Sequence, residues 1–571
     1  MRADRFSGAH SAIEARFEIS PGGAARNREW WFALALALLF HLAWQAHGIS
    51  SGSFQNLDVA GIAYNARLLL AGRLPYVDSV EIKPPGAFLL FAPLLALAGL
   101  KAVWWFSVLW GALTSAATGW FGALCWGAKW GPRVVVLHSA GAAIAADGDI
   151  NYSFWMTLPL VLSAAFSAHA RLQPDLKRAA WSWVAASAMG AFAVLIRPSA
   201  ATAALVYAAA LAPLVWQRAW GAVLCAVFSG LVGTLFAIAL VAIPFVHGGS
   251  IEAVLRGYSS VRQYADESVS AILIGAGGRI PATLNGLTCL PDQLPVCHLL
   301  LAVSLLPVAN SARTRHSRFN YLAWVFALAS LIGISLTLRF FSHDNAPLWA
   351  ALAVVVARPT GLVGAAIDWC ARVRHLELVA TAGVGVLAPW SNWQSLTWLQ
   401  SRLHESDEQV ARLCRHLSPH LGAEDTVLAW GWSAWGVYEH CGRWAPGPVY
   451  KDLTTVTTPN TNTCNRGYDP PRLKDGPFAR QFLHDLEQKR PGLIVISDYY
   501  RTLGRDPLDD WTDARRFMRD HYVLYQSTGT FQALLRRDLG SALGLLEGHP
   551  APFPSPTHET AMMSIDDFRN Q

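Results

Sequence analysis

The sequence predicts a polytopic α-helical membrane protein of about 11 transmembrane helices, followed by a C-terminal α/β domain. Of its 571 residues 53% are hydrophobic and only 15% are charged, with a mean hydropathy of +0.28. Soluble domains carry about 25% charged residues. The apolar residues also lie in blocks close to the roughly 20 residues that cross a bilayer as a helix. Beyond about residue 397 the hydrophobicity falls, and short strand and helix patterns alternate.

The first predicted span runs from Trp30 to His47. The others lie near 102–126, 134–147, 154–170, 180–196, 199–216, 220–246, 297–311, 320–338, 345–358 and 376–396. The apolar segment 86–100 is short for a span, so we expect a re-entrant or surface segment. Counting it as a span would place nearly every later Lys/Arg cluster outside, against the positive-inside rule. With a cytoplasmic N-terminus, the region after residue 397 then lies on the periplasmic or extracellular side.

These patterns predict four parts. Residues 1–28 form a cytoplasmic disordered tail, and 29–396 form the transmembrane domain with a first outer loop at 49–101. Residues 397–547 form the outer α/β domain, and the Pro-rich segment 548–571 is a second disordered tail. Within the α/β domain we expect strands at Thr426–Trp430, Leu493–Ser497, Tyr522–Tyr525 and Thr530–Leu535, and helices at Gln409–Leu417, Phe478–Lys489 and Trp511–Arg519.

The outer loop 49–101 carries acids and bases beside the membrane without being a span. From Asp58 to Leu70 the apolar residues recur at spacings of three and four, which predicts one apolar stripe of a helix. Such a helix can lie along the bilayer surface with Asp58 at its N-terminal end. A connecting loop with a solvated charged face explains the pattern about equally well.

Ionisable residues expected at membrane depth gather on the outer side of the bundle. They are Asp58, Lys83, Asp147, Asp149, Arg197, Arg339, His343 and Asp344. Charge at the bilayer is costly, so a one-sided cluster indicates a functional site. Each residue alone is also explained by the tolerance of helix ends for charge: Arg197 can cap a helix before Pro198, and His343 can cap the next one.

The first outer loop contains the pattern D-x(8)-R-x(4)-G-x(2)-P-Y-x(6)-K-P-P, formed by Asp58, Arg67, Gly72, Pro75, Tyr76, Lys83, Pro84 and Pro85. This pattern resembles the first periplasmic loop of GT-C glycosyltransferases of the protein O-mannosyltransferase and lipid A aminoarabinose transferase group. Two further stretches are similar to the same group: Arg339–Pro347 to its late outer loop, and Val427–Tyr450 to its periplasmic domain.

The resemblance implies an inverting hexosyl- or pentosyltransferase of the inner membrane, which moves a sugar from a polyprenyl-phosphate carrier to a hydroxyl of an envelope lipid, glycan or protein. A first-loop carboxylate is the general base of this family, which gives that role to Asp58. The leaving phosphate needs cationic and hydrogen-bonding partners, here Lys83, Arg197, Arg339 and His343. Residues that would position the acceptor are Arg67, Tyr76, Asp147 and Tyr258. We expect no cofactor, no metal motif and no nucleic-acid partner.

One position departs from the family pattern. Relatives carry a second acid in an Asn-x-Glu motif before a Leu-Pro pair. Here Asn151 and Leu158–Pro159 place that position at Ser153, so the acid is absent. We favour Asp149 as the replacement, with Asp147 as the alternative.

Two other functions stay open: a transporter or flippase of lipid-linked intermediates, and an inactive scaffold for envelope assembly. A transporter predicts charges at mid-membrane and internal repeats, and neither is clear in this sequence. The loop 247–296 is long enough to be a lid or a connector. Cysteines expected on the outer side can form disulfides in a pairing that the sequence does not specify; they are Cys289, Cys297, Cys414, Cys441 and Cys464.

Overall fold

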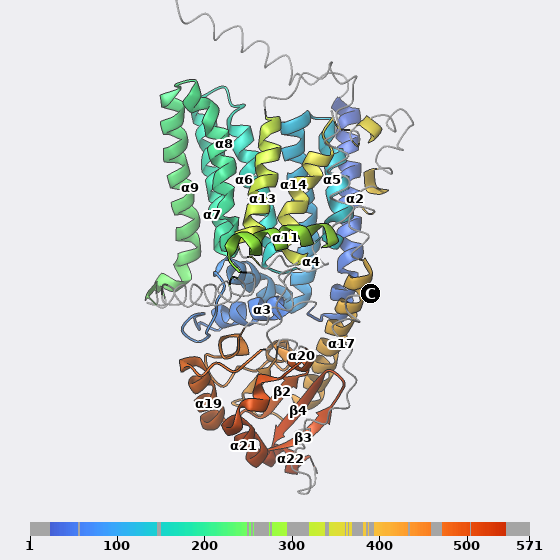
Figure 1. Cartoon of the computed structure of the whole chain (residues 1–571), viewed down its shortest axis with the longest axis vertical. Coiled ribbons are helices and arrows are strands. Elements are labelled where there is room, and N and C mark those ends of the chain that lie inside the picture. Colours follow the sequence, from blue (N-terminus) through green and yellow to red (C-terminus); the bar gives the residue numbers. More distant parts are fainter. Residues whose placement is uncertain are drawn as a thin grey trace, which may run out of the picture.

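The computed structural model shows a helical bundle joined to a small α/β region (Figure 1). It describes residues 23–54, 57–145, 150–247, 251–252, 255, 273, 277–293, 319–336, 338, 342–359, 361, 363, 365–367, 381–383, 386, 393–431, 434–457, 471–502 and 504–543. Outside these ranges lie most of the predicted tail 1–28, the tail 548–571, the predicted span 297–311, and most of the loop 247–296 and the span 376–396.

The bundle contains the apolar helices α2 (Gly23–Ser51), α4 (Gly86–Trp126), α5 (Trp130–Ala145), α6 (Tyr152–Ala170), α7 (Leu176–Ile196), α8 (Ala203–Trp216), α9 (Trp220–His247), α13 (Asn320–Leu336) and α14 (Ala346–Val356). In the described part of the chain five helices are long and apolar enough to cross a membrane: Asn27–Ser51, Gly86–Trp126, Leu176–Ile196, Pro198–Trp216 and Trp220–His247. The chain is therefore a multi-pass membrane protein, and each predicted span inside the described ranges corresponds to a helix. The total of about 11 spans stays a prediction.

The short apolar segment 86–100 is the first part of α4, which a kink divides. Ala98 and Gly99 have non-helical backbone angles, and Gly99 has a φ of +62°. A helix that ends before this kink is about 18 Å long at 1.5 Å per residue, well short of the roughly 30 Å hydrocarbon core. The kink thus separates a short helix from the longer span that follows it.

The predicted first-loop helix is α3 (Leu57–Leu70), with Asp58 in its first turn. It lies crosswise at the end of the bundle, between the membrane helices and the α/β region (Figure 1). Its residues are buried on more than the predicted stripe: Tyr64 is 1% exposed and Leu68 is fully buried. The ring of Tyr64 stacks on Tyr450 at 4.3 Å. The helix is therefore covered by protein on both sides. Its periodicity alone had suggested a helix that lies along the bilayer surface with one face exposed.

The α/β region follows α17 (Trp393–Leu417), and it contains β1 (Val427–Trp430), α18 (Val437–His440), α19 (Pro477–Lys489), β2 (Leu493–Ser497), α20 (Tyr499–Thr502), α21 (Thr512–His521), β3 (Tyr522–Ser527), β4 (Phe531–Arg536) and α22 (Arg537–Ala542). The strand order is β1-β2-β4-β3; β1 pairs parallel with β2, and the other pairs are antiparallel. All four predicted strands are confirmed, with ends shifted by at most two residues.

The α/β region has its own core and one disulfide. Trp430, Phe482 and Ile496 pack in a cluster with Tyr500 and Met518. Cys414 in α17 and Cys441 after α18 are joined by a disulfide. This settles the pairing of two of the cysteines that the sequence left open. Cys297 and Cys464, and the side chain of Cys289, lie outside the described residues.

Candidate active site

The candidate site is at the N-terminal end of α6, where the bundle meets the first outer loop. Asn151 caps this helix through its side-chain oxygen, which accepts from the backbone N–H groups of Ser153 and Phe154. The first two residues of the helix, Tyr152 and Ser153, each contact a different set of charged side chains. They bring together residues of the first loop, of the α7 end and of the segment before α14.

Lys83 is held in a turn that fixes its backbone. The Tyr76 hydroxyl donates to the Lys83 carbonyl at 2.5 Å. Tyr76 itself has a φ of +71°, a left-handed conformation that costs a non-glycine residue about 1–2 kcal/mol. Pro84 and Pro85 follow, and Pro85 precedes the first residue of α4. Strain at a residue that orients a neighbouring cation is typical of functional sites.

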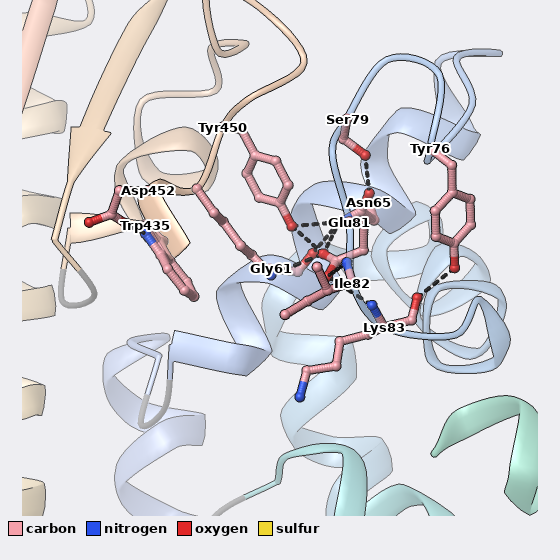
Figure 2. A network of polar contacts seen from close by, with 11 residues as sticks. Gly61, Asn65, Tyr76, Ser79, Glu81, Ile82, Lys83, Trp435, Tyr450 and Asp452 are labelled. Atoms are coloured by element: carbon pink, nitrogen blue, oxygen red, sulfur yellow. Dashed lines mark hydrogen bonds and ion pairs between the residues drawn. The ribbon is translucent and has the colours of Figure 1, made fainter. Parts of the chain in front are cut away.

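The Lys83 amine faces Tyr152 at the head of α6. Its Nζ lies 5.2 Å from the centre of the Tyr152 ring, and Figure 2 shows the amine pointing away from the polar network around Glu81. No described carboxylate forms an ion pair with it. Tyr152 thus lies beside the predicted phosphate-binding lysine.

Arg197, Asp344 and Ser153 form a second cluster one residue further along α6. Arg197 follows the last residue of α7, and Asp344 lies in the 3₁₀ turn η3 (Ser342–Asn345). The Ser153 hydroxyl donates to Asp344 Oδ1 at 3.1 Å. The Arg197 guanidinium donates to the same Oδ1 and to Ser153 Oγ. The Asp344 side chain is 3% exposed and that of Arg197 15%, so this is a nearly buried ion pair.

The two clusters approach each other through Gly86. A side chain at Gly86 would meet the Leu195 carbonyl at 2.6 Å and the Ile196 nitrogen at 3.0 Å. The turn that carries Lys83 therefore packs against the end of α7, directly before Arg197. A small cavity with room for about one water molecule lies beside this point, lined by Met156, Leu160, Arg197, Ser199, Ala200, Thr202, Ser330, Gly333, Ile334, Asp344 and Pro347. Its charged end holds Arg197 and Asp344, and most of its remaining lining is apolar or small.

A buried network fixes the first loop on its other side (Figure 2). Glu81 Oε2 accepts from the Lys451 amine at 2.9 Å, from Asn65 Nδ2 at 2.9 Å and from the Tyr450 hydroxyl. Ser79 donates to Asn65 Oδ1 at 2.6 Å. Burial, together with the adjacent negative charge of Glu81, raises the pKa of Tyr450 well above its usual value. Its hydroxyl therefore stays protonated and donates to the carboxylate.

Arg67 lies at the interface between α3 and the α/β region. Its guanidinium donates to the carbonyls of Tyr438 at 2.8 Å and Arg443 at 2.6 Å, and it lies 3.6 Å from Glu439. Burial raises the pKa of Glu439, and the charge of Arg67 offsets part of this effect. Arg67 also lies 4.3 Å from the centre of the Trp444 ring. These contacts indicate a structural role for Arg67, because its N–H groups donate to backbone carbonyls of the protein.

Among the predicted site residues, Tyr76 and Lys83 share one turn, which lies beside the end of α7 that precedes Arg197, and Asp58 lies in the first turn of α3. Asp147, Asp149, Tyr258 and Arg339 lie outside the described residues, and of His343 only the backbone is described. Three residues with central contacts had no predicted role: Glu81, Asp344 and Lys451. Asp344 was part of the outer charge cluster, whereas Lys451 is far from it in sequence. In the described ranges no group of His, Cys, Asp or Glu side chains has the arrangement of a metal site.

No family model matches this sequence, and neither does any curated protein. Solved structures do match. The apo structure of ArnT from Cupriavidus metallidurans is 13% identical, with a TM-score of 0.50 over 88% of this chain and 97% of that one. The same protein bound to undecaprenyl phosphate is 12% identical, with a TM-score of 0.49 over 90% and 98%. The oligosaccharyltransferase AglB from Archaeoglobus fulgidus, in complex with an inhibitory peptide and a dolichol-phosphate, is 10% identical, with a TM-score of 0.42 over 88% and 74%.

The match to apo ArnT extends over nearly the full length of both chains, so it includes the bundle as well as the region after it. ArnT is a lipid A aminoarabinose transferase with the GT-C architecture. The expected fold class is therefore confirmed at the level of architecture: this chain has the GT-C fold.

Proposed function

We propose that this protein is a membrane glycosyltransferase that moves a sugar from a polyprenyl-phosphate carrier to a hydroxyl of an envelope acceptor. One observation carries the proposal. Lys83, Arg197 and Asp344 come from three separate segments and converge on the first turn of α6. Two cations close together suit the phosphate of a lipid-phosphate donor, and the first-loop pattern supplies Asp58 as the carboxylate that a hydroxyl acceptor requires.

The proposed reaction is a single displacement. The acceptor oxygen attacks the anomeric carbon, the bond between that carbon and the phosphate oxygen breaks, and the polyprenyl phosphate leaves with both electrons. Asp58 takes the acceptor proton as the new bond forms. Lys83 and Arg197 neutralise the leaving phosphate, Lys83 as a point charge and Arg197 with its fork of N–H groups.

Asp344 is the proposed second carboxylate, in the place that the sequence left to Asp149 or Asp147. It comes from η3, a different segment from Ser153, but its Oδ1 lies at the Ser153 hydroxyl. A negative charge is thus present at the position where relatives have an acid in the Asn-x-Glu motif. Its contact with Arg197 points to a positioning role: it aims the guanidinium at the donor phosphate.

The membrane orientation that we propose has the N-terminus in the cytoplasm and the α/β region on the periplasmic or extracellular side. The Cys414–Cys441 disulfide supports it, since disulfides persist in oxidising compartments and are rare in the cytosol. The active site then lies on the same outer side, where a lipid-linked sugar and an envelope acceptor would meet.

The test compares purified wild type, Asp58→Asn and a matched control, Asp520→Asn, whose carboxylate is on the exposed surface of α21. Each is assayed in detergent with a panel of polyprenyl-phosphate sugars and an extract of envelope acceptors. We expect transfer by wild type and by the control, and a drop of at least ~100-fold in Asp58→Asn with donor binding unchanged.

Equal transfer by Asp58→Asn and wild type would exclude Asp58 as the base. Absence of transfer by all three proteins, with carrier binding intact, would favour the transporter or scaffold alternatives over an enzyme.

A further inference from the structure

Glu81 lies between the α/β region and the backbone of Lys83. It belongs to the first outer loop, and its only described cationic partner is Lys451, 370 residues away in sequence. The two side chains are 0% and 3% exposed. A buried carboxylate needs a compensating charge or several hydrogen-bond donors. Glu81 has both, and they come from two distant parts of the chain.

The two oxygens of Glu81 have different partners. Oε2 faces the α/β region and α3, and it accepts from Lys451, Tyr450 and Asn65. Oε1 faces its own loop, and it accepts from the Ile82 N–H at 2.8 Å and the Lys83 N–H at 3.2 Å. The rigid carboxylate group therefore connects the α/β region and α3, on one side, to the backbone of the first loop on the other.

The Lys83 backbone is fixed at both of its polar groups. Its N–H donates to Glu81 Oε1, and its carbonyl accepts from Tyr76. With the backbone held, the side chain is directed away from the network and toward Tyr152 (Figure 2). Holding a catalytic group in its productive position before substrate arrives is a main source of enzymatic rate enhancement.

Helix α3 leaves room for this connection. A side chain at Gly61 would collide with Nζ and Cε of Lys451. The amine of Lys451 thus passes directly over Gly61 to reach Glu81. Lys451 Nζ also lies 4.9 Å from the centre of the Trp435 ring, and that ring donates to Asp452 at 3.2 Å. Its position is set by the α/β region.

We propose that the α/β region positions the donor-binding Lys83 through Glu81, with Lys451 and Tyr450 holding the carboxylate and the carboxylate holding the Lys83 backbone. The inference rests on the proposed function for the role of Lys83. The mechanical connection itself does not depend on it. Glu81 and Lys451 are positioning residues, because they act on the donor through Lys83.

The first measurement is backbone hydrogen exchange of the segment 78–88 in ligand-free, full-length protein in detergent. Lys451→Met removes the cation without changing the first loop, and Lys489→Met removes an exposed lysine of α19 as the matched control. We expect Lys451→Met to raise exchange at Ile82 and Lys83 at least about 10-fold, and the control to leave it unchanged. Unchanged exchange in a folded Lys451→Met protein would overturn the inference.

The second measurement is a double-mutant cycle on transfer kinetics. Lys451→Met and Glu81→Gln should each raise the donor KM by about 10-fold, and the pair together no more than either alone. In a Lys83→Met background Lys451→Met should have no further effect on KM. A purely structural ion pair predicts a lower melting temperature with unchanged kinetics per folded molecule, which would also overturn the inference.

The two measurements separate this inference from the proposed function. If wild type transfers no sugar while exchange at Lys83 still depends on Lys451, the connection stands and the glycosyltransferase proposal fails. If Lys451→Met does not fold, Tyr450→Phe takes its place, because it removes one donor to Glu81 and keeps the ring that stacks on Tyr64. For Tyr450→Phe we expect a smaller increase in hydrogen exchange at Ile82 and Lys83. The absence of any increase would contradict the proposal.

Discussion

Ser153 lies between a guanidinium and a carboxylate that come from two other segments. Its hydroxyl donates to Asp344 and accepts from Arg197. At this point the chain needs a negative charge beside Arg197, because a buried cation without a counterion is costly. The position of the carboxylate oxygen beside Arg197 matters more for this pairing than whether the acidic residue belongs to α6 or to η3. We therefore propose that Asp344 supplies the negative charge that the motif residue at Ser153 would otherwise carry.

The proposed role of Asp344 predicts what happens when its carboxylate is removed or transferred to position 153. We expect Asp344→Asn to lower sugar transfer about 10- to 100-fold, since Arg197 loses its orienting partner. The exchange variant Ser153→Asp with Asp344→Ser returns a carboxylate to the same cluster from the other side, and it should recover most of the lost activity. Steady-state kinetics with saturating acceptor would measure both.

Ser167→Ala serves as the control for this exchange, because Ser167 lies deeper in α6 and donates only to the Ser163 carbonyl. It should transfer sugar like wild type. If Asp344→Asn had full activity, Arg197 would need no carboxylate and Asp344 would have no role in the site.

At the scale of elements, the short first part of α4 decides how the first loop meets the bundle. Gly86 begins this helix and packs against the backbone of Leu195 and Ile196 at the end of α7. Backbone atoms in a helix cannot move aside as a flexible side chain can. The close approach is therefore available only to glycine, and it places the Lys83 turn next to Arg197.

We expect Gly86→Ala to separate the two elements and to destabilise the protein by about 1–3 kcal/mol. The donor KM should rise as well, because Lys83 and Arg197 would no longer face one phosphate. The apparent melting temperature in detergent and the transfer kinetics measure the two effects. Gly221→Ala in α9 is the control, since among the described residues no atom beyond the adjacent backbone of its own helix lies within 4 Å of the added methyl group. Equal stability of Gly86→Ala and wild type would show that α4 and α7 are not in tight contact.

At the scale of the whole molecule, α17 leads from the membrane domain into the α/β region, and a disulfide ties its end to α18. Cys414 and Cys441 are 27 residues apart, and both are buried. Close by, Asp407 accepts from the Phe54 N–H at 2.7 Å and from His440 at 2.9 Å. The end of α2, α17 and α18 are therefore joined at one point, which fixes the α/β region against α3 and the first loop.

Closing a loop of this length with a disulfide is worth about 3 kcal/mol. We expect the double variant Cys414→Ala/Cys441→Ala to lower the melting temperature of the full-length protein by several degrees. Cys225→Ala is the control, because Cys225 is a free cysteine in α9. Alkylation of both Cys414 and Cys441 without prior reduction, read by mass spectrometry, would contradict the disulfide and remove the support it gives to an outer α/β region.

The sequence predicted those features that depend on neighbouring residues. Apolar runs identified the membrane helices, since a span is a property of consecutive residues. Periodicity and β-branched runs located α3 and the four strands within two residues. The first-loop pattern, whose residues Asp58, Tyr76 and Lys83 lie within 26 residues of one another, indicated the fold that the structural comparison then confirmed.

The tertiary structure decided which distant charges meet. Asp344 reaches the Ser153 position from 191 residues away, and Lys451 reaches Glu81 from 370 residues away. Both contacts hold a buried carboxylate next to a cation. A buried charge must find a partner somewhere, but the sequence does not state which one, because the pairing energy depends on distance in space and on burial. The sequence by itself therefore determined the elements and the residue types of the first loop, and only the folded chain determined the ion pairs that set its position.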